Sequence, residues 1–405
     1  MLILCKKVGG MMKKVISILL VMCLSGCTPL DLFSHNKNND SMNSTQDDNE
    51  STADSNKEIG TVNQNNINQK FYLYYYEQLT QTQKEAYLEL YKALQNQSAI
   101  YELKTPTSIK DFNIAFYAFE YDFPEAFWMW NYRYLSNDED KITRLQFNVP
   151  SDLSTTMAQV DQIVDKVIND VKGASDYEKI KYFYEWIINW TVYQRNQCEQ
   201  DITGVFLLRQ SVCGGYSKAF QYLCKKAGIK CTYVLGMTDQ LHAWNLVELD
   251  GKYYWVDATW GDSFDSEGNT VLNYHYFMIT DEVLFRTHYT LDGTVFLNSY
   301  DSIDVFKFPQ CTDNSLSYYV QTGSYFPTYD YYGIRNYVLQ KLNENPYQYF
   351  EFQIGDQASY QQALDYLFSD NYLYMTGILQ EYFGYGFRYY YYYWGDTGII
   401  GIQVY

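Results

Sequence analysis

The sequence predicts an α+β protein in which a helix that begins at a cysteine packs on an antiparallel sheet. Three observations lead to this fold class. Apolar residues recur at helical spacing in several segments, a later stretch alternates on both sides of Asp250-Gly251, and turn residues separate the two patterns. The chain of 405 residues is long enough for several domains. We therefore expect a small α/β unit before this core and an α+β unit after it.

Residues 1–27 have the layout of a secretory signal peptide. Lys13 and Lys14 precede a short apolar run that closes at LSGC, of which the last residue is Cys27. The run is too short to span a bilayer. Its end resembles a bacterial lipobox, in which the final cysteine is lipidated. We therefore expect Cys27 to anchor an extracytoplasmic protein to the bacterial cell membrane.

A polar linker follows over residues 28–68. It is rich in Asn, Asp, Ser and Gln, so it cannot bury enough apolar surface to offset the entropy of ordering, and we expect a disordered tether. The formal net charge of the chain is −18, and removal of the four lysines in the signal peptide makes it more negative. This charge argues against nucleic acid as a partner.

Residues 69–150 predict the small N-terminal α/β unit. A helical pattern covers 69–98, and the run TRLQFNVP at 143–150 is typical of a strand. Between them lies an aromatic cluster, YDFPEAFWMW at 121–130. We interpret this cluster as core, with a surface for a partner as the alternative.

Residues 311–405 predict a Tyr-rich C-terminal α+β unit. Helical stretches at 358–368 and 370–382 precede two strand-like runs, FRYYYYYW and IIGIQVY, which a Gly-Asp-Thr-Gly turn joins. Packing of a half-buried sheet is the favoured role of the tyrosines. Stacking on sugars or peptides is the alternative.

The segment between these units, 151–310, carries the chemistry. Ser175 and Glu178 form a capping box that opens one helix. Another helix is expected to begin at Cys213 and to end at Gly228, since glycine suits a left-handed C-terminal position. The unpaired N–H groups and the dipole at a helix N-terminus favour a thiolate at Cys213.

The Asp250-Gly251 dipeptide favours a two-residue type I′ hairpin, and this turn sets the register of the two strands. The predicted pairs are Leu249–Lys252, Asn245–Val256, Trp244–Asp257 and His242–Thr259. His242 and Asp257 then share a face, one diagonal step apart and within reach of a hydrogen bond. Asn245 points to the other face, so Asp257 is the residue predicted to orient His242.

Cysteine, histidine and acid thus occur in the order that a thiol acyltransferase needs. Cys213 would attack, His242 would remove its proton and later supply one, and Asp257 would fix the imidazole tautomer. Gly214 and Gly215 weaken the helix locally, and we expect them to leave room for a substrate backbone. No cofactor or metal is expected.

Cys213 has two alternative roles, a buried structural thiol or a zinc ligand. A buried structural thiol would not explain why His242 and Asp257 arrive in register. A zinc site of Cys213, Cys224, Cys231 and His242 lacks the usual ligand spacing.

Trp244 and Trp260 flank these residues and are candidates for the acyl-binding groove, with closure of the core as the equal alternative. His275 and His288 are assigned packing or surface roles.

Three motifs, VCGGYSKAFQYLCKKAGI, LHAWNLVEL and KYYWVDATWGD, resemble the core motifs of the transglutaminase-like superfamily, whose core is papain-like. The resemblance covers 155–290. It implies that Cys213, His242 and Asp257 are the nucleophile, the general base and the orienting acid. The likeness extends to bacterial surface lipoproteins with such a domain.

The sequence departs from the superfamily pattern at the oxyanion donor, often a Trp or Gln upstream of the cysteine. Trp190, Tyr193 and Gln210 are candidates, and the backbone N–H of Cys213 is favoured over them. The calcium dependence of some animal members is not expected, because DSFDSEGNT at 262–270 lacks the ligand spacing of an EF-hand.

The predicted activity is cysteine-dependent acyl transfer from an amide at the outer face of a membrane. Hydrolysis of a peptide or protein at the cell surface, including cell-wall peptides, is favoured, because the resemblance implies mainly proteases among bacterial members. Cross-linking of proteins through Gln and Lys is less favoured. A catalytically inactive peptide- or glycan-binding scaffold is the alternative from another class.

Overall fold

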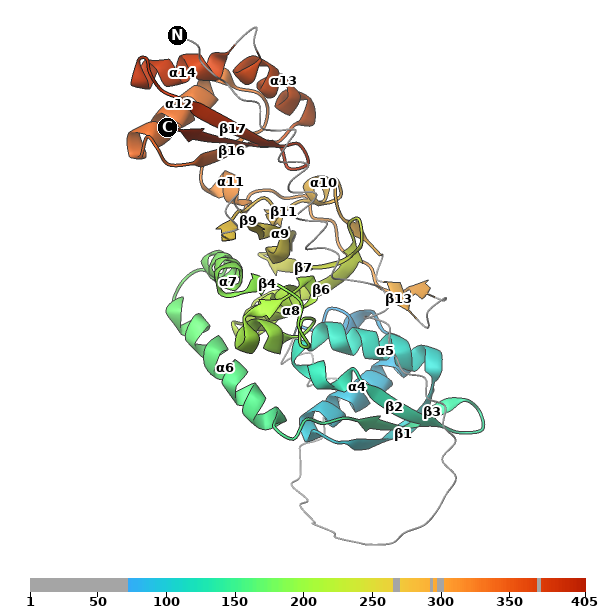
Figure 1. Cartoon of the computed structure of the whole chain (residues 1–405). Coiled ribbons are helices and arrows are strands. Elements are labelled where there is room, and N and C mark those ends of the chain that lie inside the picture. Colours follow the sequence, from blue (N-terminus) through green and yellow to red (C-terminus); the bar gives the residue numbers. More distant parts are fainter. Residues whose placement is uncertain (1–71, 265–269, 292–293, 297–301, 370–372) are drawn as a thin grey trace.

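The computed structural model describes residues 72–264, 270–291, 294–296, 302–369 and 373–405. The predicted signal peptide, Cys27 and the linker 28–68 lie outside the described residues. Among the described helices, none is long and apolar enough to cross a membrane. In Figure 1 the N-terminal, central and C-terminal elements follow one another along an elongated molecule, coloured from blue to red.

The N-terminal elements are two helices packed beside a three-stranded antiparallel sheet of order β1-β3-β2. Their bounds are α4 (Gln81–Asn96), α5 (Ile109–Asp122), β1 (Ile100–Ser108), β2 (Tyr132–Ser136) and β3 (Lys141–Phe147). The sequence predicted α4 and β3 but not α5. The reason is that α5 is buried on almost every side and therefore shows no one-sided apolar stripe. The aromatic residues that follow α5 are largely buried, which confirms their core role.

The central elements place three helices beside a five-stranded antiparallel sheet of order β11-β8-β7-β6-β12, which confirms the predicted α+β class. The helices are α6 (Leu153–Asp170), α7 (Asp176–Trp190) and α8 (Cys213–Lys226). The strands are β6 (Lys230–Met237), β7 (Leu241–Leu249), β8 (Lys252–Val256), β11 (Phe277–Ile279) and β12 (Tyr289–Thr290). Helix α8 packs on β6 and β7. The capping box at Ser175 is present, α8 begins at Cys213 as predicted, and Gly228 follows it with φ of +77°.

The predicted hairpin forms between β7 and β8. Asp250 and Gly251 have φ of 53° and 74°, as a type I′ turn requires. The pairs Leu249–Lys252 and Asn245–Val256 are confirmed, and the ladder ends there. The two further predicted pairs were wrong, because β8 stops at Val256 and the short helix α9 (Ala258–Gly261) begins directly after Asp257.

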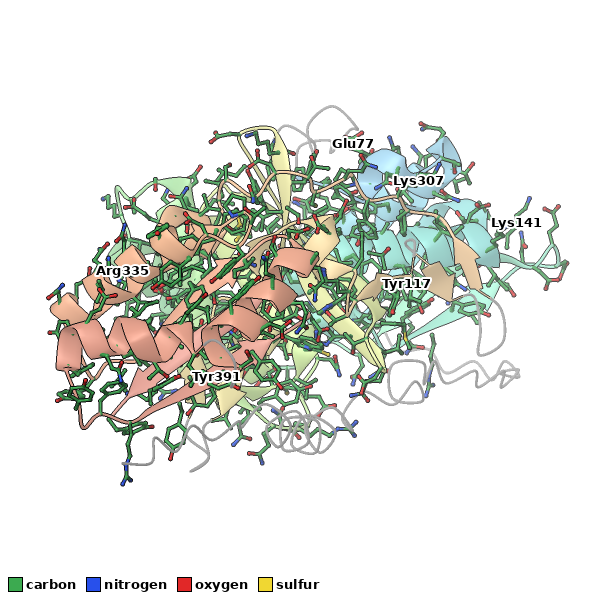
Figure 2. All side chains as sticks on the ribbon, turned by 90° about the horizontal axis from the view of Figure 1, so that it is seen from above. Glu77, Tyr117, Lys141, Lys307, Arg335 and Tyr391 are labelled. Atoms are coloured by element: carbon green, nitrogen blue, oxygen red, sulfur yellow. The ribbon has the colours of Figure 1, made fainter. Side chains whose placement is uncertain are left out.

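The C-terminal elements form a four-stranded sheet of order β15-β16-β18-β17 with its own buried core. Its strands are β15 (Tyr325–Phe326), β16 (Phe350–Ile354), β17 (Tyr389–Trp394) and β18 (Ile399–Val404). Its helices are α11 (Tyr318–Gln321), α12 (Tyr331–Glu344), α13 (Gln357–Phe368) and α14 (Tyr374–Phe383). Tyr389 and Tyr391 of β17 are buried, and Phe368 stacks on Tyr391 at 4.0 Å between ring centroids, so these tyrosines pack the sheet as predicted. Figure 2 labels Tyr391 here and the buried Tyr117 of α5 at the other end of the molecule.

Short elements complete the described fold. They are η1 (Tyr76–Gln78), η2 (Pro124–Met129), β4 (Val192–Tyr193), η3 (Gly204–Leu208), β5 (Gln210–Ser211), β9 (Asp262–Phe264), β10 (Thr270–Leu272), α10 (Asp281–Leu284), β13 (Thr294–Phe296) and β14 (Ser302–Asp304).

Buried ionic contacts join the three groups of elements. Glu120 of α5 pairs with Lys218 of α8, and both side chains are almost completely buried. At the other junction, His275 Nε2 lies 3.3 Å from the carboxylate of Glu351 on β16. The helix that begins at Cys213 is therefore tied to the N-terminal elements, and the segment before β11 is tied to the C-terminal sheet.

Candidate active site

Cys213 is the first residue of α8 and is only 3 % exposed to solvent. The preceding Val212 is extended and provides no side-chain cap. The first N–H groups of a helix lack partners within the helix, and at α8 no capping side chain of Val212 accepts from them. Cys213 shares a buried cluster with Leu241 and Ala243, the two neighbours of His242 on β7.

Gly214 and Gly215 serve a different purpose from the predicted one. A Cβ atom on Gly214 would collide with Oε1 of Gln200, and a Cβ atom on Gly215 would collide with Oγ of Ser211 and approach the carbonyl oxygen of Glu199. Gly215 is required by the close approach of the backbone of Glu199 and Asp201, whereas a Cβ atom on Gly214 would displace only the end of the Gln200 side chain. The space on the Cβ side of both glycines is thus occupied by the preceding chain and not kept open for a substrate backbone.

His242 and Asp257 form a buried hydrogen bond, with Nε2 of the imidazole 2.6 Å from Oδ2 of the carboxylate. The other carboxylate oxygen, Oδ1, accepts the backbone N–H groups of Thr259 and Trp260 at 2.9 and 3.0 Å. Asp257 is the N-cap of α9, and this local role fixes its side chain. The predicted hydrogen bond between the two residues thus forms, but the strand pairing from which it was predicted ends at Asn245–Val256, and the α9 cap sets the direction of the carboxylate.

Asn245 faces the other side of the sheet, as predicted. Its Nδ2 donates to the carbonyl oxygens of Ser217 and Thr232 at 3.0 and 3.3 Å. Ser217 lies one turn after Cys213 on α8, so this amide ties β7 to the first turns of the helix. The contact links the strand that carries His242 to the helix that carries Cys213.

The protonation of His242 follows from its partner. An ionised carboxylate only accepts hydrogen bonds, so His242 must donate from Nε2. Its Nδ1 is buried and has no hydrogen-bond partner among the described residues. Burial alone would raise the pKa of Asp257, but the two imidazoles of His242 and His288 hold that pKa well below its usual range. Nδ1 of His242 is therefore the ring nitrogen without the proton, and it forms no hydrogen bond with the thiol of Cys213 or with any other described residue.

His288 is the residue that sequence reasoning missed. Its Nε2 lies 3.1 Å from the same Oδ2 of Asp257. Its side chain is fully buried, so of the two predicted roles, packing or surface, the structure confirms packing, and the bond to Asp257 is what the sequence did not predict. It directly precedes β12, which pairs with β6 opposite the strand of His242. The segment that carries it has no local motif, so only this long-range pairing reveals its position.

The two flanking tryptophans differ. Trp244 is fully buried and packs in a hydrophobic cluster with Val234, Leu246 and Trp255. Of its two predicted roles, it therefore has the one of closing the core. Trp260 is half-buried, and its ring lies 6.1 Å from that of His242 and 4.5 Å from that of His288.

One of the predicted oxyanion donors is already occupied. The indole N–H of Trp190 donates to the carbonyl oxygen of Val205 at 3.1 Å, and the Arg209 guanidinium lies 3.6 Å above its ring. Trp190 therefore cannot supply a hydrogen bond to a reacting oxygen without losing this bond. The favoured donor remains the backbone at the start of α8.

The possible metal-ligand atoms of His242, Asp257 and His288 lie within 4.8 Å of one another. Among the described residues, this group of His, Cys, Asp or Glu side chains is close enough together to hold a metal ion. The hydrogen bonds from two imidazoles to one acceptor-only carboxylate account for the convergence, so we interpret it as a proton network. The zinc set weighed from the sequence, which included Cys224 and Cys231, does not converge among these residues.

Residues 162–258 match the family model of the transglutaminase-like superfamily. This span contains Cys213, His242 and Asp257. Residues 162–258 therefore form a transglutaminase-like domain.

Two curated relatives are similar to part of the chain. Kyphoscoliosis peptidase of Mus musculus is 24% identical over 163 residues, which cover 34% of this chain and 25% of that protein. The Homo sapiens protein of the same name is 23% identical over 158 residues, covering 33% and 24%. The chain thus spans about a quarter of the length of these relatives.

Two solved structures are also similar in part. One is a candidate cysteine protease from Cytophaga hutchinsonii, 14% identical, covering 32% of this chain and 61% of that chain with a TM-score of 0.23. The other is described as a TGase, 14% identical, covering 42% and 47% with a TM-score of 0.23.

A second buried acid, Asp262, lies shortly after the residues that match the family model. Burial raises the pKa of Asp262 to about 7, and a hydrogen bond from Tyr216 opposes this only in part. Oδ2 lies 2.7 Å from the Tyr216 hydroxyl, which lies 3.2 Å from the carbonyl oxygen of Thr191. A protonated Asp262 can donate from Oδ2 to Tyr216 while Tyr216 donates to Thr191, whereas Oδ1 is buried without a hydrogen-bond partner among the described residues, which also disfavours the charged form.

We expect Asp262→Asn to stabilise the folded state at neutral and alkaline pH. The native pKa is raised, so the folded protein binds the extra proton and loses stability as the pH rises from the unfolded value, about 4, through about 7. Asparagine keeps the donor and cannot ionise. The difference in unfolding free energy between variant and wild type, measured by urea denaturation from pH 4 to 9, should grow up to about pH 7 and then level off. A difference independent of pH would contradict this.

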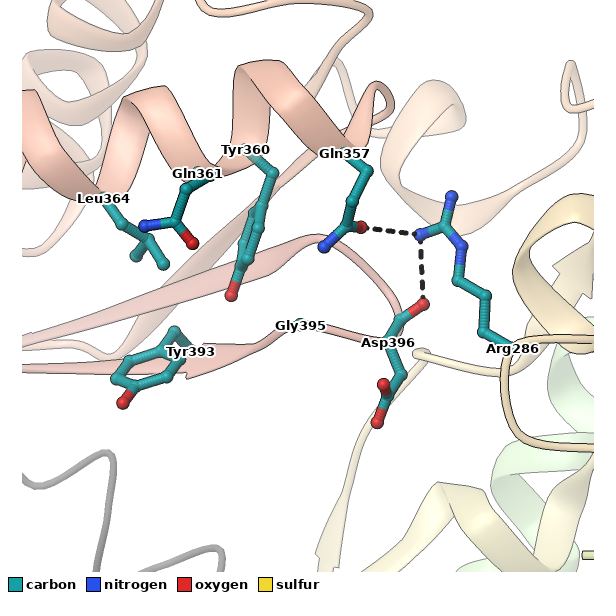
Figure 3. A pocket seen from close by; sticks show the side chains of 8 residues that line it. All are labelled: Arg286, Gln357, Tyr360, Gln361, Leu364, Tyr393, Gly395 and Asp396. Atoms are coloured by element: carbon teal, nitrogen blue, oxygen red, sulfur yellow. Dashed lines mark hydrogen bonds between the residues drawn. The ribbon is translucent and has the colours of Figure 1, made fainter.

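A pocket with a volume of 510 Å³ lies beyond the transglutaminase-like domain, between the segment after α10 and the C-terminal elements (Figure 3). It is lined by Arg286, Gln357, Tyr360, Gln361, Leu364, Tyr393, Gly395 and Asp396. None of the predicted catalytic residues lines it, although Arg286 precedes His288 by two residues.

Proposed function

We propose that this protein transfers the acyl group of an amide through a thioester on Cys213, with hydrolysis of peptides as the favoured outcome. The observation that carries the proposal is the buried bond between His242 Nε2 and Asp257, which leaves Nδ1 as the proton acceptor. The match over 162–258 and the position of Cys213 at the start of α8 support it.

The proposed reaction has two halves. Cys213 gives its proton to Nδ1 of His242 while sulfur forms a bond to the carbonyl carbon, and the C–N bond then breaks as the amine takes the proton from Nδ1. Water next gives a proton to Nδ1 as its oxygen forms a bond to the thioester carbon, the C–S bond then breaks to release the carboxylic acid, and the departing sulfur takes the proton back from Nδ1. Asp257 stays ionised throughout and stabilises the imidazolium at each stage.

A second candidate function is a non-catalytic peptide- or glycan-binding scaffold. The observation that favours it is burial: Cys213 is 3 % exposed and His242 and Asp257 are fully buried. A substrate must reach the sulfur for catalysis, whereas a scaffold needs only the packed fold. The reactivity of the thiol separates the two functions.

The test is the pH dependence of alkylation by iodoacetamide at Cys213, followed by peptide mass spectrometry. We expect a reactive thiolate well below the ordinary thiol pKa of about 8.5 in the wild type, and loss of that reactivity in His242→Ala. Cys224, buried on the same helix, is an internal reference thiol. A slow Cys213 that ignores the His242 substitution would favour the scaffold.

Two further points of the proposal concern the acceptor and the place of action. Release of new amino termini from peptides supports hydrolysis, whereas incorporation of a primary amine into a glutamine peptide supports cross-linking.

We also propose that Cys27 is lipidated and holds the protein at the outer face of a bacterial membrane. Incorporation of a labelled fatty acid into wild type but not Cys27→Ala is the corresponding check.

A further inference from the structure

The carboxylate of Asp257 accepts four hydrogen bonds. Two come from backbone N–H groups at the start of α9, and two come from the Nε2 atoms of His242 and His288, at 2.6 and 3.1 Å from the same oxygen. Because an ionised carboxylate cannot donate, both imidazoles must carry their proton on Nε2. A Cys-His-Asp mechanism accounts for the first imidazole and leaves the second unexplained.

The far side of His288 is arranged to keep that tautomer. Its Nδ1 lies 2.8 Å from Oγ1 of Thr287, and the hydroxyl of Tyr276 lies 3.1 Å from the same Oγ1. A neutral His288 with its proton on Nε2 has a lone pair on Nδ1, which accepts from Thr287, and Thr287 can accept from Tyr276. The chain of donors from Tyr276 through Thr287 and His288 ends at Asp257.

The surroundings of His288 also favour a neutral ring. Burial lowers the pKa of His288, and the hydrogen bond to Asp257 opposes this only in part. The titratable groups that face it are Asp257, His242 and Tyr276, and the rings of Trp244 and Trp260 complete the contacts. Two imidazolium rings against one carboxylate would leave a net buried positive charge, which is costly. Protonation of both rings at once is therefore disfavoured.

The segment that carries His288 is held from two sides. Asp281 at the start of α10 accepts the indole N–H of Trp255 at 2.7 Å and the backbone N–H of Cys311 at 3.1 Å. Arg286 donates to Oε1 of Gln357 and to the carbonyl oxygen of Asp396, and Figure 3 shows these two bonds to the C-terminal elements. The position of His288 is thus set by contacts that do not depend on Asp257.

We propose that His288 is a positioning residue, whose Nε2–H holds the Asp257 carboxylate ionised and aimed at His242. This inference rests on the proposed function, because it assigns the second imidazole a task in the same reaction. Loss of the donor leaves one lone pair of a buried carboxylate unsatisfied. Asp257 then supports the imidazolium of His242 less well, and the thiolate of Cys213 forms at a higher pH.

The experiment compares His288→Leu, which removes the donor, with His288→Gln, whose Nε2–H₂ group can replace it. We expect His288→Leu to lower the alkylation rate of Cys213 at neutral pH by about 10- to 100-fold, the cost of a lost hydrogen bond to a charged group, and to move its pH midpoint upward. His288→Gln should restore most of the rate and the midpoint. His275→Gln is the matched control, because His275 is buried at another junction.

A second measurement reports on the bond itself. The chain has four histidines, so ¹⁵N-histidine labelling gives a ring spectrum that can be assigned with the variants. We expect the His288 ring to stay neutral, with its proton on Nε2, from pH 5 to 9. If His288→Leu does not fold, Thr287→Val should still shift the His288 ring signals, because Nδ1 loses its donor.

The outcomes separate the two proposals. A reactive Cys213 whose pH profile ignores His288→Leu overturns the role of His288 alone, and so does a His288 ring that becomes cationic. One equivalent of zinc per chain in the purified protein also overturns it, since a metal ion would replace both Nε2 protons. A wild-type Cys213 without reactivity overturns the proposed function, while the ring spectrum still tests the bond from His288 to Asp257.

Discussion

Cys213→Ala is expected to abolish acyl transfer, with a loss of at least about a thousandfold in kcat/KM for any peptide substrate found. The sulfur forms the covalent bond to the acyl group, so no neighbouring side chain can replace it. The backbone donors at the start of α8 remain in this variant. They would sustain only the small residual rate that oxyanion stabilisation and binding provide without a nucleophile.

Cys224→Ala is the matched control for this prediction. It removes a fully buried thiol from the same helix and creates a similar small cavity, but Cys224 lies in the core on the far part of α8. We expect it to lower stability modestly and to retain the activity. Equal activity of the Cys213→Ala variant and the wild type would exclude Cys213 as the nucleophile.

Glu120→Ala is expected to destabilise the protein by about 3–5 kcal/mol, the usual cost of removing one partner of a buried ion pair. Glu120 and Lys218 are 4 % and 5 % exposed at the side chain. The substitution leaves the ammonium of Lys218 buried, with the rings of Trp130 and Tyr233 at 5.0 and 5.5 Å from it. Cation–π contacts of this kind offset only part of the lost charge pairing.

The double variant Glu120→Leu with Lys218→Met tests the origin of this loss. It replaces the pair by apolar side chains of similar size, so no uncompensated charge remains, and we expect it to regain most of the stability. Urea denaturation of the single and double variants at neutral pH provides the unfolding free energies. A double variant less stable than Glu120→Ala would show that the ion pair itself stabilises the junction between α5 and α8.

The local chemistry of the sequence was sufficient for several elements around the site. The capping box at Ser175, the start of α8 at Cys213 and the positive φ at Asp250 and Gly251 each depend on neighbours within a few residues. The two-residue turn sets the pairing of the strands up to Asn245–Val256 and so brings Asp257 near His242, although Asp257 itself lies just beyond the paired residues.

The errors have a common cause, which is contact between segments far apart in the chain. The predicted pair of Trp244 with Asp257 failed because Asp257 caps α9 instead of continuing β8. The glycines after Cys213 were read as a substrate path, but residues 199–201 of the preceding chain occupy that space. Helix α5 was missed because tertiary packing buries it on almost every side and removes the stripe that identifies an amphipathic helix.

The sequence by itself therefore determined the order of the proposed nucleophile, base and acid along the chain, and the hairpin that brings His242 near Asp257, since short-range turn and cap preferences act on consecutive residues. Only the tertiary structure decided that a second imidazole, His288, reaches the carboxylate of Asp257. That contact requires β12 to add to the sheet beside β6 and the segment around α10 to be held by Trp255 and the C-terminal elements. Such pairing joins residues far apart in sequence, and no local pattern in the chain encodes it.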